Sequence, residues 1–306
     1  MTDAVYVTKS SDDASSWTSA VEFNGTERWS GIDGSLTYIT DNTAYLIEGY
    51  SRGDPIVRAI DTSDGSEIWN APGSSIEPET AATNTPDTVY VAGDQLVALD
   101  TAEGSVRWRY EHGDAESDIH VVSNGTAYVT LDREVVVAAS GGEELWRVES
   151  LSWPNIHAPT DSAVLVTDQN HTRALDAVTG EQQWVQPLGG VQVFNNSDRV
   201  YVSKNGTFGN QSTVSALAVD DGSEIWSIEV GTEVPRVKVD LDIIGEENTT
   251  NEHSIFIQVD ERKLKKVDSD GDVVQTWVSE EEIYDFLVDD FLIVSTDSGI
   301  HALDSY

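Results

Sequence analysis

Two histidines occupy matching positions in successive repeats of this 306-residue chain, and their side chains could bind a ligand. His120 and His157 each lie eight residues before the same apolar position of the following strand, and Asp118 and Asn155 lie two residues before them. Along an extended strand this spacing predicts that all four side chains share one face. Imidazole, carboxylate and amide groups could together hold a metal ion or a small polar ligand. The alternative is that they face a neighbouring sheet and bond to backbone groups.

A second candidate is Asp268-Ser-Asp-Gly-Asp272, which resembles half of a calcium-binding loop. A calcium loop also needs a bidentate glutamate farther along, and more ligands than a turn between two strands supplies. The same place in an earlier repeat holds Asp61-Thr-Ser-Asp-Gly65, a hairpin-turn sequence. We therefore interpret the segment as a turn and assign no firm metal ligand.

No set of residues indicates nucleophilic or thiol chemistry. The chain has no cysteine, which excludes disulfides, thiolate metal sites and cysteine nucleophiles. Serine, histidine and aspartate are present, but they lie in no activating context such as Gly-x-Ser-x-Gly. We predict no catalytic residues.

A repeated sequence motif positions the candidate residues. In Ala98-Leu-Asp-Thr-Ala-Glu-Gly-Ser-Val-Arg-Trp108 a strand ends at Asp100, a tight turn follows, and a second strand carries Trp108. Glycine supplies the positive φ of the turn, and the large indole is predicted to dock each repeat on the next. Glycine precedes tryptophan by four residues in six copies and by six in the last. The seven tryptophans are Trp29, Trp69, Trp108, Trp146, Trp184, Trp226 and Trp277.

The period predicts an all-β fold. Successive repeat tryptophans are 38 to 51 residues apart, a period typical of β-propellers with four-stranded antiparallel blades. We expect one propeller domain over residues 1–306. Thirty strand candidates favour eight blade positions with incomplete first and last blades, and seven blades are the alternative. The two ends are expected side by side, because closure removes exposed sheet edges. The two histidines would then lie on innermost strands at the mouth of the channel.

The motif of residues 98–108, together with Val89-Tyr-Val-Ala-Gly-Asp94 before it, resembles the repeat of pyrroloquinoline-quinone (PQQ) propellers. That family includes quinoprotein dehydrogenases and the noncatalytic propeller lipoprotein of bacterial outer-membrane assembly. The resemblance covers almost the whole chain, but a fold hosts many functions. For a dehydrogenase it implies PQQ with calcium, and often a disulfide of adjacent cysteines. This chain has no cysteine and no inserted domain, so we predict no cofactor, neither PQQ nor calcium.

Acidic residues dominate the composition. There are 17 basic and 55 acidic residues, a net charge of −38. The acids are spread over every repeat, which indicates adaptation to high salt of the haloarchaeal type, since salt screens self-repulsion. The same charge disfavours nucleic acid, and no apolar run is long enough for a membrane helix. Glu261-Arg-Lys-Leu-Lys-Lys266 is the one basic cluster, either solvated, paired with neighbouring acids, or a docking site for an acidic partner.

These observations favour a noncatalytic, salt-adapted platform that binds a protein partner or a small ligand, and we expect a monomer. The alternative is an enzyme with its site at the channel mouth, either a quinoprotein dehydrogenase or a glycan-active protein. No secretion signal is present in the chain as given. Asn-x-Ser/Thr sequences such as those at Asn24 and Asn124 nevertheless favour an exported, cell-surface protein over a cytoplasmic one. A truncated piece of a longer surface protein is a third alternative.

Overall fold

A computed structural model of the chain describes most of its residues. These are residues 4–10, 16–40, 42–48, 56–72, 80–85, 87–113, 115–157, 162–189, 192–195, 199–204, 212–230, 236–239, 255–288 and 292–303. All regular secondary structure in the described residues is β-strand, which confirms the predicted all-β class. The described part also contains no helix long and apolar enough to cross a membrane.

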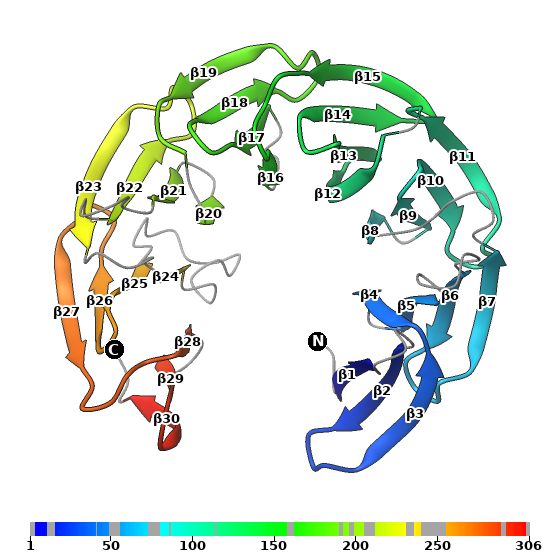
Figure 1. The fold of residues 1–306 in the computed structure, drawn as a ribbon, viewed down its shortest axis with the longest axis horizontal. Coiled ribbons are helices and arrows are strands. Elements are labelled where there is room, and N and C mark those ends of the chain that lie inside the picture. Colours follow the sequence, from blue (N-terminus) through cyan, green and yellow to red (C-terminus); the bar gives the residue numbers. More distant parts are fainter. Residues whose placement is uncertain are drawn as a thin grey trace, which may run out of the picture. The chain divides into compact units, whose positions relative to one another are not determined.

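The chain forms two compact units. One unit is Met1–Val164 with Asp176–Glu181, and the other is Leu165–Leu175 with Gln182–Tyr306. In both, strands that follow one another in sequence pair side by side, so every sheet is an antiparallel meander (Figure 1). The predicted single domain and the expected closure of its ends stay predictions.

The first sheet has three strands and the next three sheets have four each. Their bounds are β1 (Ala4–Ser10), β2 (Ser16–Glu22) and β3 (Glu27–Asp33); β4 (Ser35–Ile39), β5 (Thr43–Glu48), β6 (Ile56–Asp61) and β7 (Glu67–Pro72); β8 (Thr80–Thr85), β9 (Thr88–Ala92), β10 (Gln95–Asp100) and β11 (Val106–Glu111); and β12 (Ser117–Ser123), β13 (Thr126–Leu131), β14 (Val135–Ser140) and β15 (Glu143–Val148).

Three more four-stranded sheets and a last three-stranded sheet follow. Their bounds are β16 (Asn155–His157), β17 (Ala163–Thr167), β18 (Thr172–Asp176) and β19 (Gln182–Gln186); β20 (Gln192–Asn195), β21 (Arg199–Lys204), β22 (Ser212–Ala218) and β23 (Glu224–Val230); β24 (Arg236–Val239), β25 (Ile255–Asp260), β26 (Lys263–Val267) and β27 (Val273–Val278); and β28 (Asp285–Val288), β29 (Leu292–Thr296) and β30 (Gly299–Leu303). The described residues thus contain the thirty strands expected from the sequence, while the number of blades stays a prediction.

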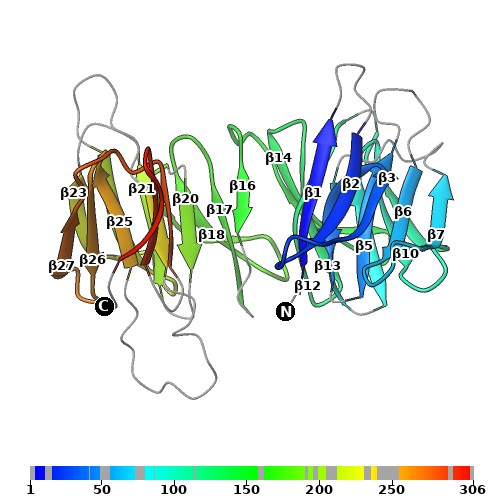
Figure 2. The same ribbon diagram turned by 90° about the horizontal axis from the view of Figure 1, so that it is seen from below.

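Successive sheets stack through corresponding strands. First strands contact first strands, in the pairs β4–β8, β8–β12 and β12–β16 of one unit and β20–β24 and β24–β28 of the other. Within each unit the fourth strands lie on the side away from the first strands (Figure 1). The axes of the antiparallel strands are roughly aligned, with the connections at their two ends (Figure 2). The first strands therefore bring residues of neighbouring repeats together.

The hydrophobic core lies between neighbouring sheets. One cluster joins Tyr45 and Val57 of one sheet to Val89 and Leu99 of the next. Because inner sheets are covered on both faces, their second strands are apolar without alternation, and all five residues of β9 and of β17 are buried. Burial on both faces explains why these strands read as continuous apolar runs.

The repeated motif forms a turn that contacts the tryptophan of the preceding sheet. Asp100 accepts hydrogen bonds from the backbone N–H groups of Ala102 and Glu103, and Gly104 has a φ of +66°. The Trp69 indole donates to the carbonyl of Thr101 at 2.7 Å. A Cβ added to Gly104 would lie 2.6 Å from the Trp69 ring, so only glycine leaves room for the indole there.

The same contact recurs in four other places. Trp29 donates to Thr62, Trp146 to Ala177, Trp184 to Val219 and Trp226 to Ser269, at 2.7 to 3.1 Å. The docking role predicted for these indoles is a statement about stability, and it stays a prediction until variants are measured.

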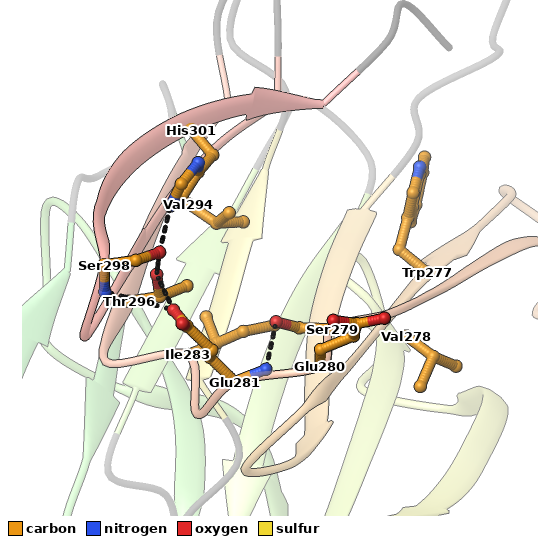
Figure 3. A pocket seen from close by; sticks show the side chains of 10 residues that line it. All are labelled: Trp277, Val278, Ser279, Glu280, Glu281, Ile283, Val294, Thr296, Ser298 and His301. Atoms are coloured by element: carbon orange, nitrogen blue, oxygen red, sulfur yellow. Dashed lines mark hydrogen bonds between the residues drawn. The ribbon is translucent and has the colours of Figure 1, made fainter.

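Trp108 and Trp277 depart from this arrangement. Among the described residues neither indole N–H has an acceptor, and both side chains are half-buried instead of buried. For Trp108 the difference goes with the shortened turn that ends at Gly142. A Cβ added to Gly142 would lie 2.7 Å from the Arg109 carbonyl oxygen and farther, 3.5 Å, from Cβ of Trp108, so this glycine does not pack on the indole ring as Gly104 does. Trp277 borders a pocket of about 320 Å³ (Figure 3).

Candidate functional site

The two histidines lie on first strands that contact one another, β12 and β16. His120 is the extra residue of a β-bulge, because Ile119 pairs with Val129 and Val121 pairs with Tyr128. A bulge redirects the side chain that it contains and is common beside functional sites.

Burial makes both imidazoles weak bases. His120 Nε2 lies 3.1 Å from Thr130 Oγ1. Burial lowers the pKa of His120, and the nearby Asp118 carboxylate partly opposes this. Burial also lowers the pKa of His157, to about 4, and the positive charge of a protonated His120 contributes. Both rings are therefore neutral at neutral pH, each with one donor and one acceptor nitrogen.

The structure brings together three of the four predicted ligand residues. Asp118 and His157 both lie close enough to His120 for electrostatic interaction. Asn155 begins β16 and is exposed. In the described part of the chain no three His, Cys, Asp or Glu side chains are grouped to hold a metal ion. The cluster combines two neutral imidazoles with the Asp118 carboxylate, and its role in binding a ligand stays a prediction.

Two other candidates form local contacts. The Asp268 carboxylate accepts hydrogen bonds from the N–H groups of Asp270 at 3.0 Å and Asp272 at 2.9 Å, as a hairpin-turn aspartate does. In the basic cluster the Lys263 ammonium lies 3.2 Å from Asp260, so at least this lysine has an acidic neighbour in its own sheet. These contacts account for Asp268 and Lys263 without a ligand.

Trp153 forms a surface feature that the repeat pattern did not predict. Its side chain is 55% exposed, and the Arg133 guanidinium carbon lies 4.6 Å from the centre of its ring. This distance is a cation–π contact. A signal was available, because Trp153 is one of two tryptophans outside the seven repeats. An exposed indole beside an arginine is a combination common in protein-binding surfaces.

The backbone around Trp153 is strained and well anchored. Positive φ values occur at Asp132, Arg133, Ser150 and Trp153, between 48° and 63°. Each such residue costs about 1–2 kcal/mol relative to the right-handed region. Two backbone hydrogen bonds hold the segment, from Trp153 N–H to the Arg133 carbonyl and from Leu151 N–H to a carbonyl of the same turn. Strain maintained in this way is frequently found at functional surfaces.

Comparison with protein families gives a match over most of the chain. Residues 53–118 and 93–306 match the family described as outer membrane protein assembly factor BamB. A stretch of 148 residues is 32% identical to the serine/threonine-protein kinase AfsK of Streptomyces griseus, and the match covers 42% of this chain. The chain spans only 18% of the length of that kinase.

Solved structures show the fold. BamB from Moraxella catarrhalis has a TM-score of 0.60 at 12% identity, covering 100% of this chain and 99% of that protein. The dihydro-heme d1 dehydrogenase NirN, solved in complex with DHE, has a TM-score of 0.60 at 9% identity, covering 96% of this chain and 68% of that protein. The computationally designed protein Ika8 has a TM-score of 0.62 at 14% identity, covering 98% and 97%. The likeness to BamB and NirN confirms the predicted propeller fold, and the family match confirms that its repeats are of the PQQ type.

Proposed function

We propose that this chain, which belongs to the BamB family of PQQ-repeat propellers, is a binding platform that performs no catalysis of its own. The observation that carries the proposal is the family match, which covers the chain from residue 53 to residue 306. BamB is by its description an outer membrane protein assembly factor, a role that fits a binding platform. NirN shares the fold and is a dehydrogenase, so the fold alone does not decide between the two roles.

The surface around Trp153 and Arg133 is the best-supported contact site for a partner protein. Tryptophan and arginine carry a large share of the binding energy in protein interfaces. Both residues lie on segments whose backbones are joined by hydrogen bonds, so little conformational freedom remains to be lost on binding. A rigid, exposed aromatic side chain is the kind of anchor that a partner can cover.

The partner contact is tested by affinity capture in high salt with three forms of the chain. Trp153→Ala should lose the partner that the parent retains. Phe23→Ala is the matched control, because Phe23 is also an exposed aromatic residue, at 75%. It should retain the partner. Loss of the same partner from both variants, or from neither, would remove Trp153 from the binding surface.

The absence of catalysis is tested separately. The full chain is incubated with PQQ and Ca²⁺ and assayed for dye reduction with alcohols and sugars. We expect no turnover above that of the cofactor alone. Substrate-dependent turnover would establish the quinoprotein alternative and overturn the proposal.

A further inference from the structure

Three Asn-x-Ser/Thr sequences lie wholly within the described residues, and the structure presents them differently. They are Asn24-Gly-Thr26, Asn124-Gly-Thr126 and Asn170-His-Thr172. Such a sequence accepts a glycan on the asparagine amide and requires a hydroxyl two residues later. The folded chain can therefore be modified only where both groups are accessible.

The Asn24 site lies at the tip of the hairpin that joins β2 to β3. Asn24, Gly25 and Thr26 are all exposed. The Thr26 N–H donates to the Asn24 side-chain oxygen at 2.8 Å, which orients the amide. Within the described residues neither the Asn24 amide nitrogen nor the Thr26 hydroxyl has a hydrogen-bond partner. Both groups that the modification needs are open to an enzyme.

The Asn124 site lies in the turn between β12 and β13. Asn124 is exposed, and its φ of 49° is a conformation that asparagine adopts more readily than most residues. Thr126 is half-buried, and its hydroxyl bonds to no other described residue. The turn is anchored by the Ser140 hydroxyl, which donates to the Gly125 carbonyl at 2.9 Å. The acceptor amide is therefore presented on a fixed turn.

In the Asn170 site the hydroxyl is already occupied. Thr172 is fully buried, and its Oγ1 donates to the Leu188 carbonyl at 2.6 Å. The Asp168 carboxylate holds the same turn, because it accepts from the N–H groups of Asn170 and His171 at 2.8 Å each. Asn170 is exposed, but an enzyme could reach the Thr172 hydroxyl only after local opening of this turn.

Asn124 and the Trp153 surface lie at opposite ends of their sheet. Connections in an antiparallel meander alternate between its two ends. Asn124 lies between β12 and β13, whereas Arg133 lies between β13 and β14 and Trp153 follows β15. A glycan on Asn124 would leave the surface around Trp153 and Arg133 open to a partner.

We propose that Asn24 and Asn124 are N-glycosylation sites of the folded chain and that Asn170 is not. The sugar donor is a lipid-linked oligosaccharide. The asparagine amide nitrogen forms a bond to the anomeric carbon of the first sugar, and the bond from that carbon to the lipid phosphate breaks. The phosphate leaves with the bonding electron pair, and the amide releases one proton. The proposal does not depend on the Trp153 contact, so either can fail without the other.

The test supplies the folded full chain with a purified oligosaccharyltransferase and a lipid-linked oligosaccharide, and each site is followed by mass spectrometry. Synthetic peptides of residues 20–30 and 166–176 carry the Asn24 and Asn170 sites without tertiary structure. We expect both peptides to be modified at similar rates. In the folded chain Asn170 should be modified about tenfold or more slowly than Asn24, because the buried Thr172 hydroxyl must first be released.

Two variants test the Asn24 site itself. Thr26→Val removes the hydroxyl and should abolish modification at Asn24, with modification at Asn124 unchanged. Thr26→Ser keeps a hydroxyl and should retain modification at Asn24. The protein isolated from its natural host should carry glycans on Asn24 and Asn124 and an unmodified Asn170.

Three results would overturn the proposal. Equal modification of Asn24 and Asn170 in the folded chain would show that burial of Thr172 protects nothing. A modified 20–30 peptide with an unmodified Asn24 in the folded chain would show that the hairpin tip is not accessible to the enzyme. Unmodified Asn24 and Asn124 in the protein from its natural host would show that neither is a glycosylation site.

Discussion

Gly104 offers the sharpest test of the contact between a tryptophan and the next turn. Its φ of +66° is a conformation that alanine adopts at a cost of about 1–2 kcal/mol. In addition, the new Cβ would lie 2.6 Å from Cδ2 and Cε3 of Trp69. Carbon atoms in contact prefer about 3.5–4.0 Å, so the ring or the turn must move by about 1 Å. Such overpacking costs about 1–3 kcal/mol.

Gly125 is the matched control. It also lies in a hairpin turn with a φ of +75°, but a Cβ added there would meet no atom within 4 Å. Gly125→Ala therefore carries the backbone cost alone, about 1–2 kcal/mol, whereas Gly104→Ala should lose about 2–5 kcal/mol. The gain from a stiffer unfolded chain is the same for both substitutions and cancels in the comparison.

The assay is urea unfolding of the parent and both variants in molar KCl, with unchanged m-values required for the comparison. A second pair of variants locates the clash. With Trp69→Leu in the background, Gly104→Ala should become about 1–3 kcal/mol less costly, because the ring that it meets is gone. If Gly104→Ala and Gly125→Ala cost the same within about 0.5 kcal/mol, the close contact with the indole does not contribute to stability.

Three further measurements test other parts of the structure. Trp146→Phe should lower the free energy of unfolding in urea by about 1–2 kcal/mol more than Trp108→Phe does, because of these two indoles Trp146 alone donates to a carbonyl, that of Ala177. Equal losses would contradict this. The pKa of His157 is lowered from 6.5 to about 4, so the folded state resists protonation, and the free energy of unfolding should fall by about 3 kcal/mol as the pH drops from 6.5 to about 4. His157→Gln should remove this part of the pH dependence. Parallel plots of unfolding free energy against pH for parent and variant would refute it. With a net charge of −38, the thermal midpoint should rise between low and molar KCl, as screening shortens from about 10 to 3 Å; a constant midpoint would argue against salt adaptation.

Strand positions could be predicted from the sequence because turn residues mark them locally. The predicted strand end at Asp100 is the end that the structure has. The next strand, predicted to carry Trp108, runs from Val106 to Glu111, and a bulge after Ala98 in its partner strand shifts the pairing between the two. A bulge depends on pairing between two strands, so composition and spacing within one strand do not reveal it.

The candidate sites were less predictable for the same reason. Spacing correctly placed His120 and His157 on neighbouring first strands, but not the bulge that contains His120. The sequence also distinguished Trp153 only as a tryptophan outside the repeat. Its exposure follows from a backbone conformation with positive φ, which tertiary contacts impose against the intrinsic preference of the residue.

The surface proposed around Trp153 follows from one physical property of the repeat. Each indole that is covered by a turn is buried and bonded, as Trp69 is by Gly104, and it has no capacity left for another molecule. Trp153 lies outside the repeat and is 55% exposed. The indoles available for recognition are therefore those that the repeat does not use for its own packing. A search for binding surfaces in chains of this kind should begin with such unmatched tryptophans.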